Sequence, residues 1–203
     1  MPTKSAFSVV GLAHKLFLAA EAEGYTPEML NALAESPSLL AGMRSVQLGL
    51  ANIKPILHAI DCDSPVFIPD GWSVLPDEDD DPNKCQLPNR VKGVFTWDPT
   101  SAKLYLPKKQ QGDKRIVGND LRKELKSQPV LPANILDYLL ANPHLIPEEY
   151  KGKAIFFWGT IYRSSDGHLC VRYLYWHGSG WYWGCSWLGN DFYGDAPALV
   201  RAS

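Results

Sequence analysis

The sequence predicts an α+β fold in which N-terminal helices pack on an antiparallel sheet that ends in a three-stranded aromatic meander. Apolar residues recur at spacings of three and four in the first sixty residues, which is typical of amphipathic helices. Three strand-like runs bounded by turn residues occupy residues 154–188. With 203 residues, 45% of them hydrophobic and 21% charged, the chain can bury a core without a metal ion or a disulfide.

The helical region is predicted to cover residues 1–60. A first helix is expected to stop at Gly24, because glycine favours a helix C-terminus. Thr26 and Ser36 each precede a proline and are predicted N-caps of two further helices, the first of them ending near Ala34. Residues 61–203 are then a second, α+β region, unless both regions form one continuous domain. Lysine and arginine are sparse in the helices, which disfavours a helix-turn-helix DNA-binding unit.

The middle of the chain is rich in turn residues. Prolines recur between Cys62 and Arg90, and the acidic run 77–81 is interpreted as a surface loop because its spacing does not match a calcium-binding loop. Strands are predicted around residues 94–97 and 104–106, joined by a turn at Asp98-Pro99. Two helices are expected at 118–125 and 131–141.

One basic stretch runs from Lys103 to Lys126. Its candidate phosphate contacts are Lys108, Lys109, Lys114 and Arg115. Acidic residues are interspersed, so the favoured interpretation is a charged face in contact with water. The alternative is a surface that binds the phosphates of a nucleic acid.

The aromatic meander consists of runs 154–163, 169–176 and 180–188, separated by strong hairpin signals at Asp166-Gly167 and Gly178-Ser179. Two-residue loops would pair Trp176 with Trp181, Leu174 with Trp183 and Arg172 with Cys185. Alternation along the strands then places Phe157, Ile161 and Leu174 on one face with the tryptophans of the third strand. Neither face has the polar alternation of a solvated surface.

The opposite face is the candidate binding surface. Its proposed binding residues are Trp158, Tyr162, Tyr173, Tyr175 and Tyr182. Tyrosine tolerates partial exposure and is favoured at interfaces, whereas the tryptophan face, with Arg163 and Arg172 on its indoles, resembles a core. The alternative is that both aromatic layers are structural.

Common catalytic and nucleotide-binding motifs are absent from the sequence, and the sequence assigns no catalytic residue. An alternative enzymatic interpretation, a hydrolase or nuclease, would use His144, Glu148, Glu149 and Asp166 if they converge in a cleft. The five histidines are isolated from one another, and the four cysteines form no C-x-x-C pair, so no metal site and no cofactor are expected.

A cytoplasmic location without a membrane partner is expected. The apolar stretch from Ala6 to Ala20 is interrupted by His14 and Lys15, which are costly in a bilayer or a signal peptide, although Ala19, Ala20 and Ala22 faintly imitate a cleavage site. A formal net charge of −2 provides no global field that would attract nucleic acid.

Residues 119–125, 146–153 and 156–163 (NDLRKEL, IPEEYKGK and FFWGTIYR) resemble a group of uncharacterised small bacterial proteins that share a Trp/Tyr-rich ending. The resemblance covers roughly the last hundred residues and implies a bacterial, cytoplasmic protein. It implies no activity or ligand. The sequence therefore favours a non-enzymatic binding module with a protein partner, ahead of the hydrolase or nuclease and of a nucleic-acid binder that combines Lys103–Lys126 with aromatic stacking.

Overall fold

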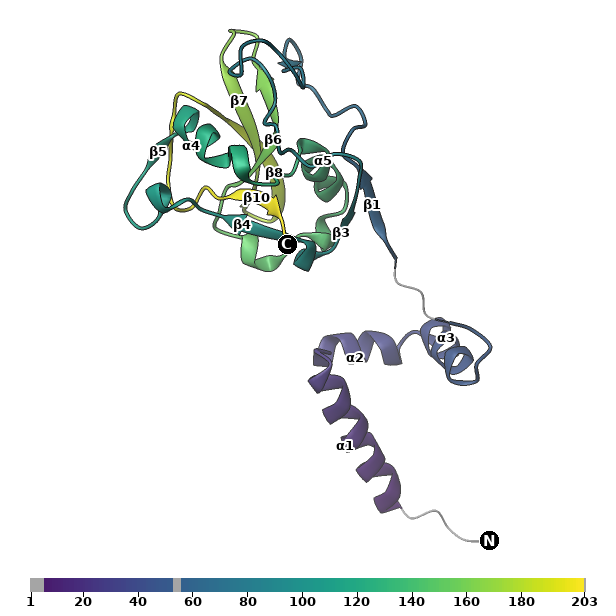
Figure 1. The fold of residues 1–203 in the computed structure, drawn as a ribbon. Coiled ribbons are helices and arrows are strands. Elements are labelled where there is room, and N and C mark those ends of the chain that lie inside the picture. The colour runs from purple at the N-terminus through teal and green to yellow at the C-terminus, as the bar shows by residue number, and fades with distance from the viewer. Residues whose placement is uncertain (1–5, 53–55, 203) are drawn as a thin grey trace. The chain divides into compact units, whose positions relative to one another are not determined.

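The computed structural model describes residues 6–52 and 56–202, and the chain divides into two compact units, Met1–Ile56 and Leu57–Ser203 (Figure 1). In its described residues, the first unit contains three helices, α1 (Ala6–Ala22), α2 (Pro27–Ala34) and α3 (Pro37–Gln47). The second unit contains the sheets and the remaining helices. The α+β class predicted from the sequence is confirmed.

The helix boundaries of the first unit follow local capping chemistry. Gly24 has φ +84° just after α1, in the left-handed region where glycine avoids a steric penalty. The Thr26 hydroxyl accepts a hydrogen bond from Met29 N–H at 3.3 Å, and Ser36 accepts one from Leu39 N–H at 3.4 Å. Both predicted N-caps are confirmed. Among the described helices, none is both long and apolar enough to cross a membrane.

The second unit is built on a six-stranded sheet in the order β4-β10-β6-β7-β8, with β2 also paired to β6. All pairs in this sheet are antiparallel except β10 with β6. Its strands are β2 (Ser73–Val74), β4 (Ala102–Tyr105), β6 (Ile155–Arg163), β7 (Leu169–His177), β8 (Gly180–Trp187) and β10 (Ala198–Arg201). The predicted aromatic meander is β6-β7-β8, and β8 ends the sheet.

Shorter elements surround this sheet. Two small antiparallel pairs are β1 (His58–Asp61) with β3 (Val94–Trp97), and β5 (Ile116–Val117) with β9 (Asp191–Phe192). The α-helices are α4 (Gly118–Glu124) and α5 (Ala133–Ala141). The 3-10 turns are η1 (Pro99–Ser101), η2 (Lys108–Gln110), η3 (Leu125–Ser127), η4 (Pro143–Leu145) and η5 (Glu148–Tyr150).

Two details differ from the sequence prediction. Residues 58–60, assigned to the helical region, belong to strand β1, whose pairing with β3 no local helix pattern reveals. The strands β3 and β4 exist, but they join different sheets and do not pair with each other. A capping box between Asp98 and Ser101 turns the chain through η1 instead of closing a hairpin.

The predicted register of β7 with β8 is confirmed. Trp176 pairs with Trp181, Leu174 with Trp183 and Arg172 with Cys185, across the two-residue loop Gly178-Ser179.

The predicted facing of β6 against β7 is only partly right. Ser164 N–H donates to His168 O at 2.9 Å, so the loop between β6 and β7 has three residues instead of the predicted two. One additional residue in the loop moves each side chain of β6 near the hairpin to the opposite face relative to β7. Ile161 therefore pairs with Val171, and Tyr162 pairs with Cys170 on the opposite face from the predicted one. The register shifts again between Phe156 and Ile161. At the start of β6 the side chains therefore lie on their predicted faces, and Phe157 lies on the same face as Leu174.

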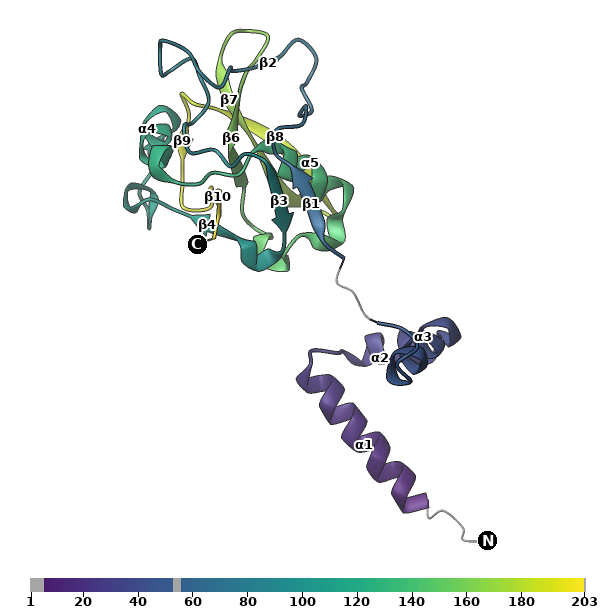
Figure 2. The same cartoon turned by 45° about the vertical axis from the view of Figure 1, so that its right-hand side comes forward.

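The two faces of β6 carry separate cores, and α5 and α4 cover opposite sides of the sheet (Figures 1 and 2). Phe157 lies in the core of α5, whose Ile135, Leu136 and Leu139 are fully buried. Trp158 lies in the other core with Leu121 of α4. Because β6 is covered on both faces, only the far end of the meander, at β8, keeps aromatic residues exposed.

Candidate functional site

The edge strand β8 has exposed aromatic side chains on both faces of the sheet. Tyr182 is 49% exposed, Trp183 36% and Trp187 44%. Successive side chains of a strand point to opposite faces, so Tyr182 lies on one face and the two tryptophans on the other. We call β8 with these three side chains the aromatic edge.

The outer side of β8 has free backbone groups. Among the described residues, no strand pairs with this side, because β8 is the last strand of the sheet. Leu188 N–H donates to Leu169 O at 2.8 Å, so the even-numbered residues of β8 face β7 and the backbone groups of Trp183 and Cys185 point outward. The strand contains no proline and no charged residue. Natural edge strands usually carry a proline or a charged residue, which prevents another strand from pairing with them.

The tryptophan face of the aromatic edge is held in place by a buried arginine. The Arg172 guanidinium lies 4.5 Å from the ring centroid of Trp183, and its side chain is 1% exposed. It forms an ion pair of 2.8 Å with Asp137 and donates to Tyr162 Oη at 3.3 Å. Phe67 contacts the same indole edge-on, with ring centroids 5.8 Å apart. Trp183 is therefore fixed before any partner binds.

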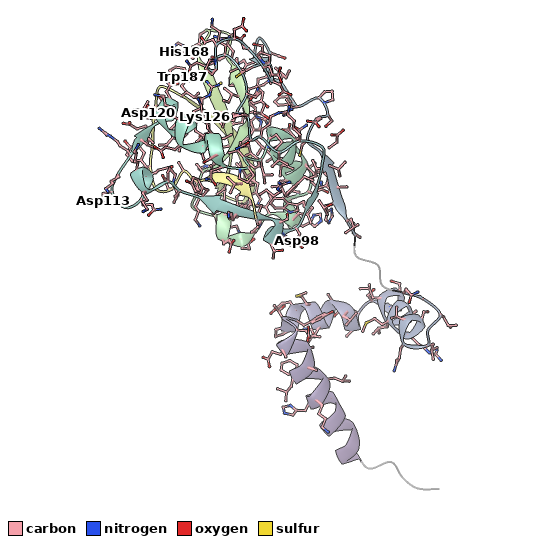
Figure 3. The ribbon with its side chains drawn as sticks, in the orientation of Figure 1. Asp98, Asp113, Asp120, Lys126, His168 and Trp187 are labelled. Carbon is pink, nitrogen blue, oxygen red and sulfur yellow. The ribbon has the colours of Figure 1, made fainter. Side chains whose placement is uncertain are left out.

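A second contact fixes Trp187 at the end of β8. His168 stacks on its indole with ring centroids 4.9 Å apart, and Figure 3 shows the two side by side. Asp166 lies 3.0 Å from His168 Nδ1. Hydrogen bonds from Ser164 and then from His168 lower the pKa of the Asp166 carboxyl. The imidazole of His168 is thus oriented to support the indole.

The tyrosine face forms a row of rings that becomes more exposed toward the aromatic edge. Centroids are 4.8 Å apart between Phe156 and Tyr173, 5.6 Å between Tyr173 and Tyr175, and 6.1 Å between Tyr175 and Tyr182. The Tyr173 ring covers Gly184, where an added Cβ would lie 2.6 Å from Cζ of that ring. Burial raises the pKa of Tyr173, so its hydroxyl stays protonated.

The structure corrects two members of the predicted binding surface. Trp158 is fully buried beside Phe192, with ring centroids 5.4 Å apart. Tyr162 is fully buried on the opposite face and donates to Phe67 O at 3.1 Å. Neither side chain can contact a partner, because helices and loops cover both faces of β6. Tyr173, Tyr175 and Tyr182 share a face as predicted.

The predicted basic contacts gather in a groove of about 1070 Å³ between η2, β5, α4 and β9. Lys108, Lys109, Lys114 and Arg115 all line it. Lys109 pairs with Glu124 at 2.6 Å and Arg115 with Asp191 at 3.2 Å. Neither Lys108 nor Lys114 has an acidic partner among the described residues.

The groove also contains acids and one aromatic ring that the sequence pattern did not connect with it. Asp113 lies in the loop between η2 and β5 and Asp120 lies on α4, as Figure 3 shows. Tyr193 is 49% exposed and lies 3.5 Å from Arg115 through its hydroxyl. The Gln110 side chain fixes the backbone around Tyr193 by donating to Tyr193 O and Ala196 O, each at 2.7 Å. Only the fold brings Tyr193 to the basic stretch.

The residues of the alternative enzymatic site do not converge. His144, Glu148 and Glu149 precede β6 and Asp166 follows it, and a nine-residue strand spans roughly 26 Å. In the part of the chain that the structure describes, no three His, Cys, Asp or Glu side chains gather where they could bind a metal ion.

Neither a protein-family model, nor a curated protein, nor a solved structure matches this chain, so its function has to be inferred from the geometry of the molecule.

Proposed function

We propose that this protein is a non-enzymatic binding module that recognises an extended segment of a protein partner by adding it as a strand to β8. One observation supports the proposal above all: an uncharged edge strand with outward backbone groups lies between exposed aromatic side chains on both faces. Main-chain hydrogen bonds to such an edge supply affinity, and side-chain pockets on each face supply specificity.

The aromatic side chains would provide the specific contacts. Tyrosine and tryptophan are enriched among the residues that dominate binding energy at interfaces. Trp183 is held by Arg172 and Phe67, and Trp187 by His168, so neither loses much side-chain freedom on binding. The partner segment would be extended and largely uncharged, with apolar side chains alternating toward the two faces.

A proline substitution tests the backbone contribution. Cys185 N–H points outward, so Cys185→Pro removes a donor for the incoming strand without removing a bond to β7. Cys185→Ala is the matched control. Proteins retained from lysate by the wild type and by Cys185→Ala should be lost with Cys185→Pro, and their binding should protect the amides of Trp183 and Cys185 from hydrogen exchange.

Near-ultraviolet circular dichroism is the control for native packing in both variants. Equal retention by Cys185→Pro and Cys185→Ala would exclude strand addition. If Tyr182→Ser and Trp187→Ala then also retained the partner, the aromatic edge would have no part in recognition.

A second candidate function, binding of single-stranded nucleic acid, is favoured by the position of Tyr193 in the basic groove. A base could stack on the exposed ring while Lys108 and Lys114 contact phosphates. Four acidic residues also line this groove, which makes this candidate the weaker one.

Fluorescence anisotropy with a labelled single-stranded oligonucleotide tests this candidate. Affinity should fall with rising salt, by about tenfold or more between low and physiological salt. It should also fall in Tyr193→Ala but not in Tyr193→Phe, which keeps the stacking face. An affinity that does not change with salt, or that is unchanged in Lys108→Ala/Lys114→Ala, would contradict nucleic-acid binding in this groove.

A further inference from the structure

Cys185 lies between the two exposed tryptophans of the aromatic edge. The register of β7 with β8 is continuous, so Cys185 shares a face with Trp183 and Trp187, two residues from each. The two tryptophans are therefore about 13 Å apart along the strand. Between them lies a free cysteine, the smallest side chain of β8 on this face. We call the space above Cys185, between Trp183 and Trp187, the tryptophan gap.

The contacts of both indoles leave the outer side of the tryptophan gap open. Trp183 is drawn toward β7, because the Arg172 guanidinium lies 4.5 Å from its ring centroid. Trp187 is drawn toward the end of β8, because it stacks on His168 with ring centroids 4.9 Å apart. The antiparallel register places His168 beyond Trp187 as seen from Cys185. Cys185 itself is partly exposed, so a side chain can approach it from the outer side of β8.

The tryptophan gap offers no partner for a charge. Burial raises the pKa of the Cys185 thiol, so the thiol stays protonated at neutral pH and behaves as a small apolar group. Arg172, which pairs with Cys185 across the two strands, is 1% exposed and has its charge compensated by Asp137 at 2.8 Å. A charged side chain that entered the gap would lose hydration without gaining an ion pair, so the gap favours apolar side chains.

A strand added to β8 places one side chain directly at the tryptophan gap. The residue opposite Cys185 on the added strand points to the same face, with its Cβ about 5 Å from that of Cys185. Trp183 and Trp187 are then its diagonal neighbours at about 7 to 8 Å, a separation that large side chains bridge. A large apolar side chain at this position contacts both indoles, whereas a small one leaves the gap unfilled.

We propose that the tryptophan gap is the specificity subsite of the aromatic edge and takes one large apolar side chain, of the size of leucine, isoleucine or phenylalanine, from the added segment. The inference rests on the proposed function, because it is the added strand that brings a side chain opposite Cys185. Cys185 is then the residue that sets the size of this side chain. Because both indoles are held before binding, the gap keeps its width when the segment arrives.

A displayed library of random eight-residue segments, the length of β8, tests the proposal on the full chain. Segments that the wild type retains and Cys185→Pro does not are those that bind β8. One position of these segments should be enriched in large apolar residues. In Cys185→Ile, whose side chain fills the gap, this position should change to glycine, alanine or serine. The segments selected on the wild type should bind Cys185→Ile about tenfold or more weakly, because they overpack the gap.

Ser186→Ile is the matched control, because it adds the same side chain at the next residue, on the opposite face. It should leave the preference at that position unchanged. If near-ultraviolet circular dichroism shows that Cys185→Ile has lost its native packing, Cys185→Val makes the same comparison with a smaller group.

Two outcomes separate failure of the subsite from failure of strand addition. Selected segments that protect the amides of Trp183 and Cys185 from hydrogen exchange, but show the same size preference in the wild type and in Cys185→Ile, would overturn the subsite and leave strand addition standing. A library from which no segment is selected, or whose selected segments leave these amides unprotected, would overturn strand addition and the subsite together.

Discussion

Gln86 pairs with the backbone of Ile161 through both ends of its side-chain amide. Ile161 N–H donates to Oε1 at 2.7 Å, and Nε2 donates to Ile161 O at 3.0 Å. The amide lies on the side of β6 that faces β2, where Nε2 also donates to Leu75 O at 2.9 Å, and it takes the place of β2 just beyond the end of that strand. A buried backbone group without a partner costs free energy, so Gln86 stabilises β6 where its pairing with β2 ends.

The first prediction concerns this pair. Gln86→Leu keeps the size of the side chain but leaves Ile161 N–H buried without a partner, so we expect a loss of about 3 kcal/mol in the free energy of unfolding. Urea denaturation measures it. Gln111→Leu, which removes an exposed hydrogen bond to Leu106 O, should cost less than about 1 kcal/mol. Equal losses in both variants would show that Gln86 has no special role.

The register of the meander can be predicted from the sequence only in part. The β7–β8 register follows from local chemistry, because Gly178 supplies the positive φ of a two-residue turn. The facing of β6 does not, since its hairpin to β7 has a three-residue loop and its register shifts between Phe156 and Ile161. The prediction for Tyr162 is wrong because it assumes a two-residue loop. No pattern within β6 indicates either the loop length or the shift.

Predictability of the candidate site was limited for a related reason. Composition and alternation indicated Tyr173, Tyr175 and Tyr182 as one face, and the structure confirms that they share it. Exposure depends on which strand ends the sheet, and strand order is set by long-range pairing. Trp183 and Trp187 were therefore interpreted as core, yet both are exposed because β8 is the edge.

The second prediction concerns Gly159 in β6. An added Cβ would lie 2.6 Å from Pro132 N and 2.7 Å from the carbonyl carbon of Leu131. Both atoms belong to backbone that is fixed, because Gly159 N–H donates to Leu131 O at 3.0 Å. We expect Gly159→Ala to destabilise the protein by about 3 kcal/mol or more, because the added methyl group overpacks against backbone that cannot move away.

Gly189→Ala is the matched control for this substitution. No atom lies within 4 Å of its added Cβ, and its φ is not positive, so stability should change by less than about 0.5 kcal/mol. Thermal melts of the two variants measure the difference. A Gly159→Ala protein as stable as Gly189→Ala would mean that the chain around Leu131 moves easily.

The third prediction concerns the ion pair of Arg172 and Asp137. Arg172 is almost completely buried, so Asp137→Leu leaves a buried charge without its partner and should cost about 3 kcal/mol. Arg172→Met/Asp137→Leu removes both charges and should recover much of this loss. Urea denaturation of the two single variants and the double variant gives the coupling energy. Additive losses would contradict a direct interaction.

The fourth prediction concerns alkaline pH. Burial, the largest cause in each case, raises the pKa of Cys62 to about 11, of Cys170 to about 12 and of Tyr162 to about 12. These groups keep their protons in the folded state at a pH where the unfolded chain has already released them. Their contribution to stability is therefore complete below about pH 9 and is lost as the pH rises toward about 12.

Urea midpoints should stay level up to about pH 8.5 and then fall. Cys170→Ala should flatten this decline, whereas Cys85→Ala should not. A midpoint that stays level to about pH 11 in the wild type would mean that these side chains are accessible to water in the folded protein.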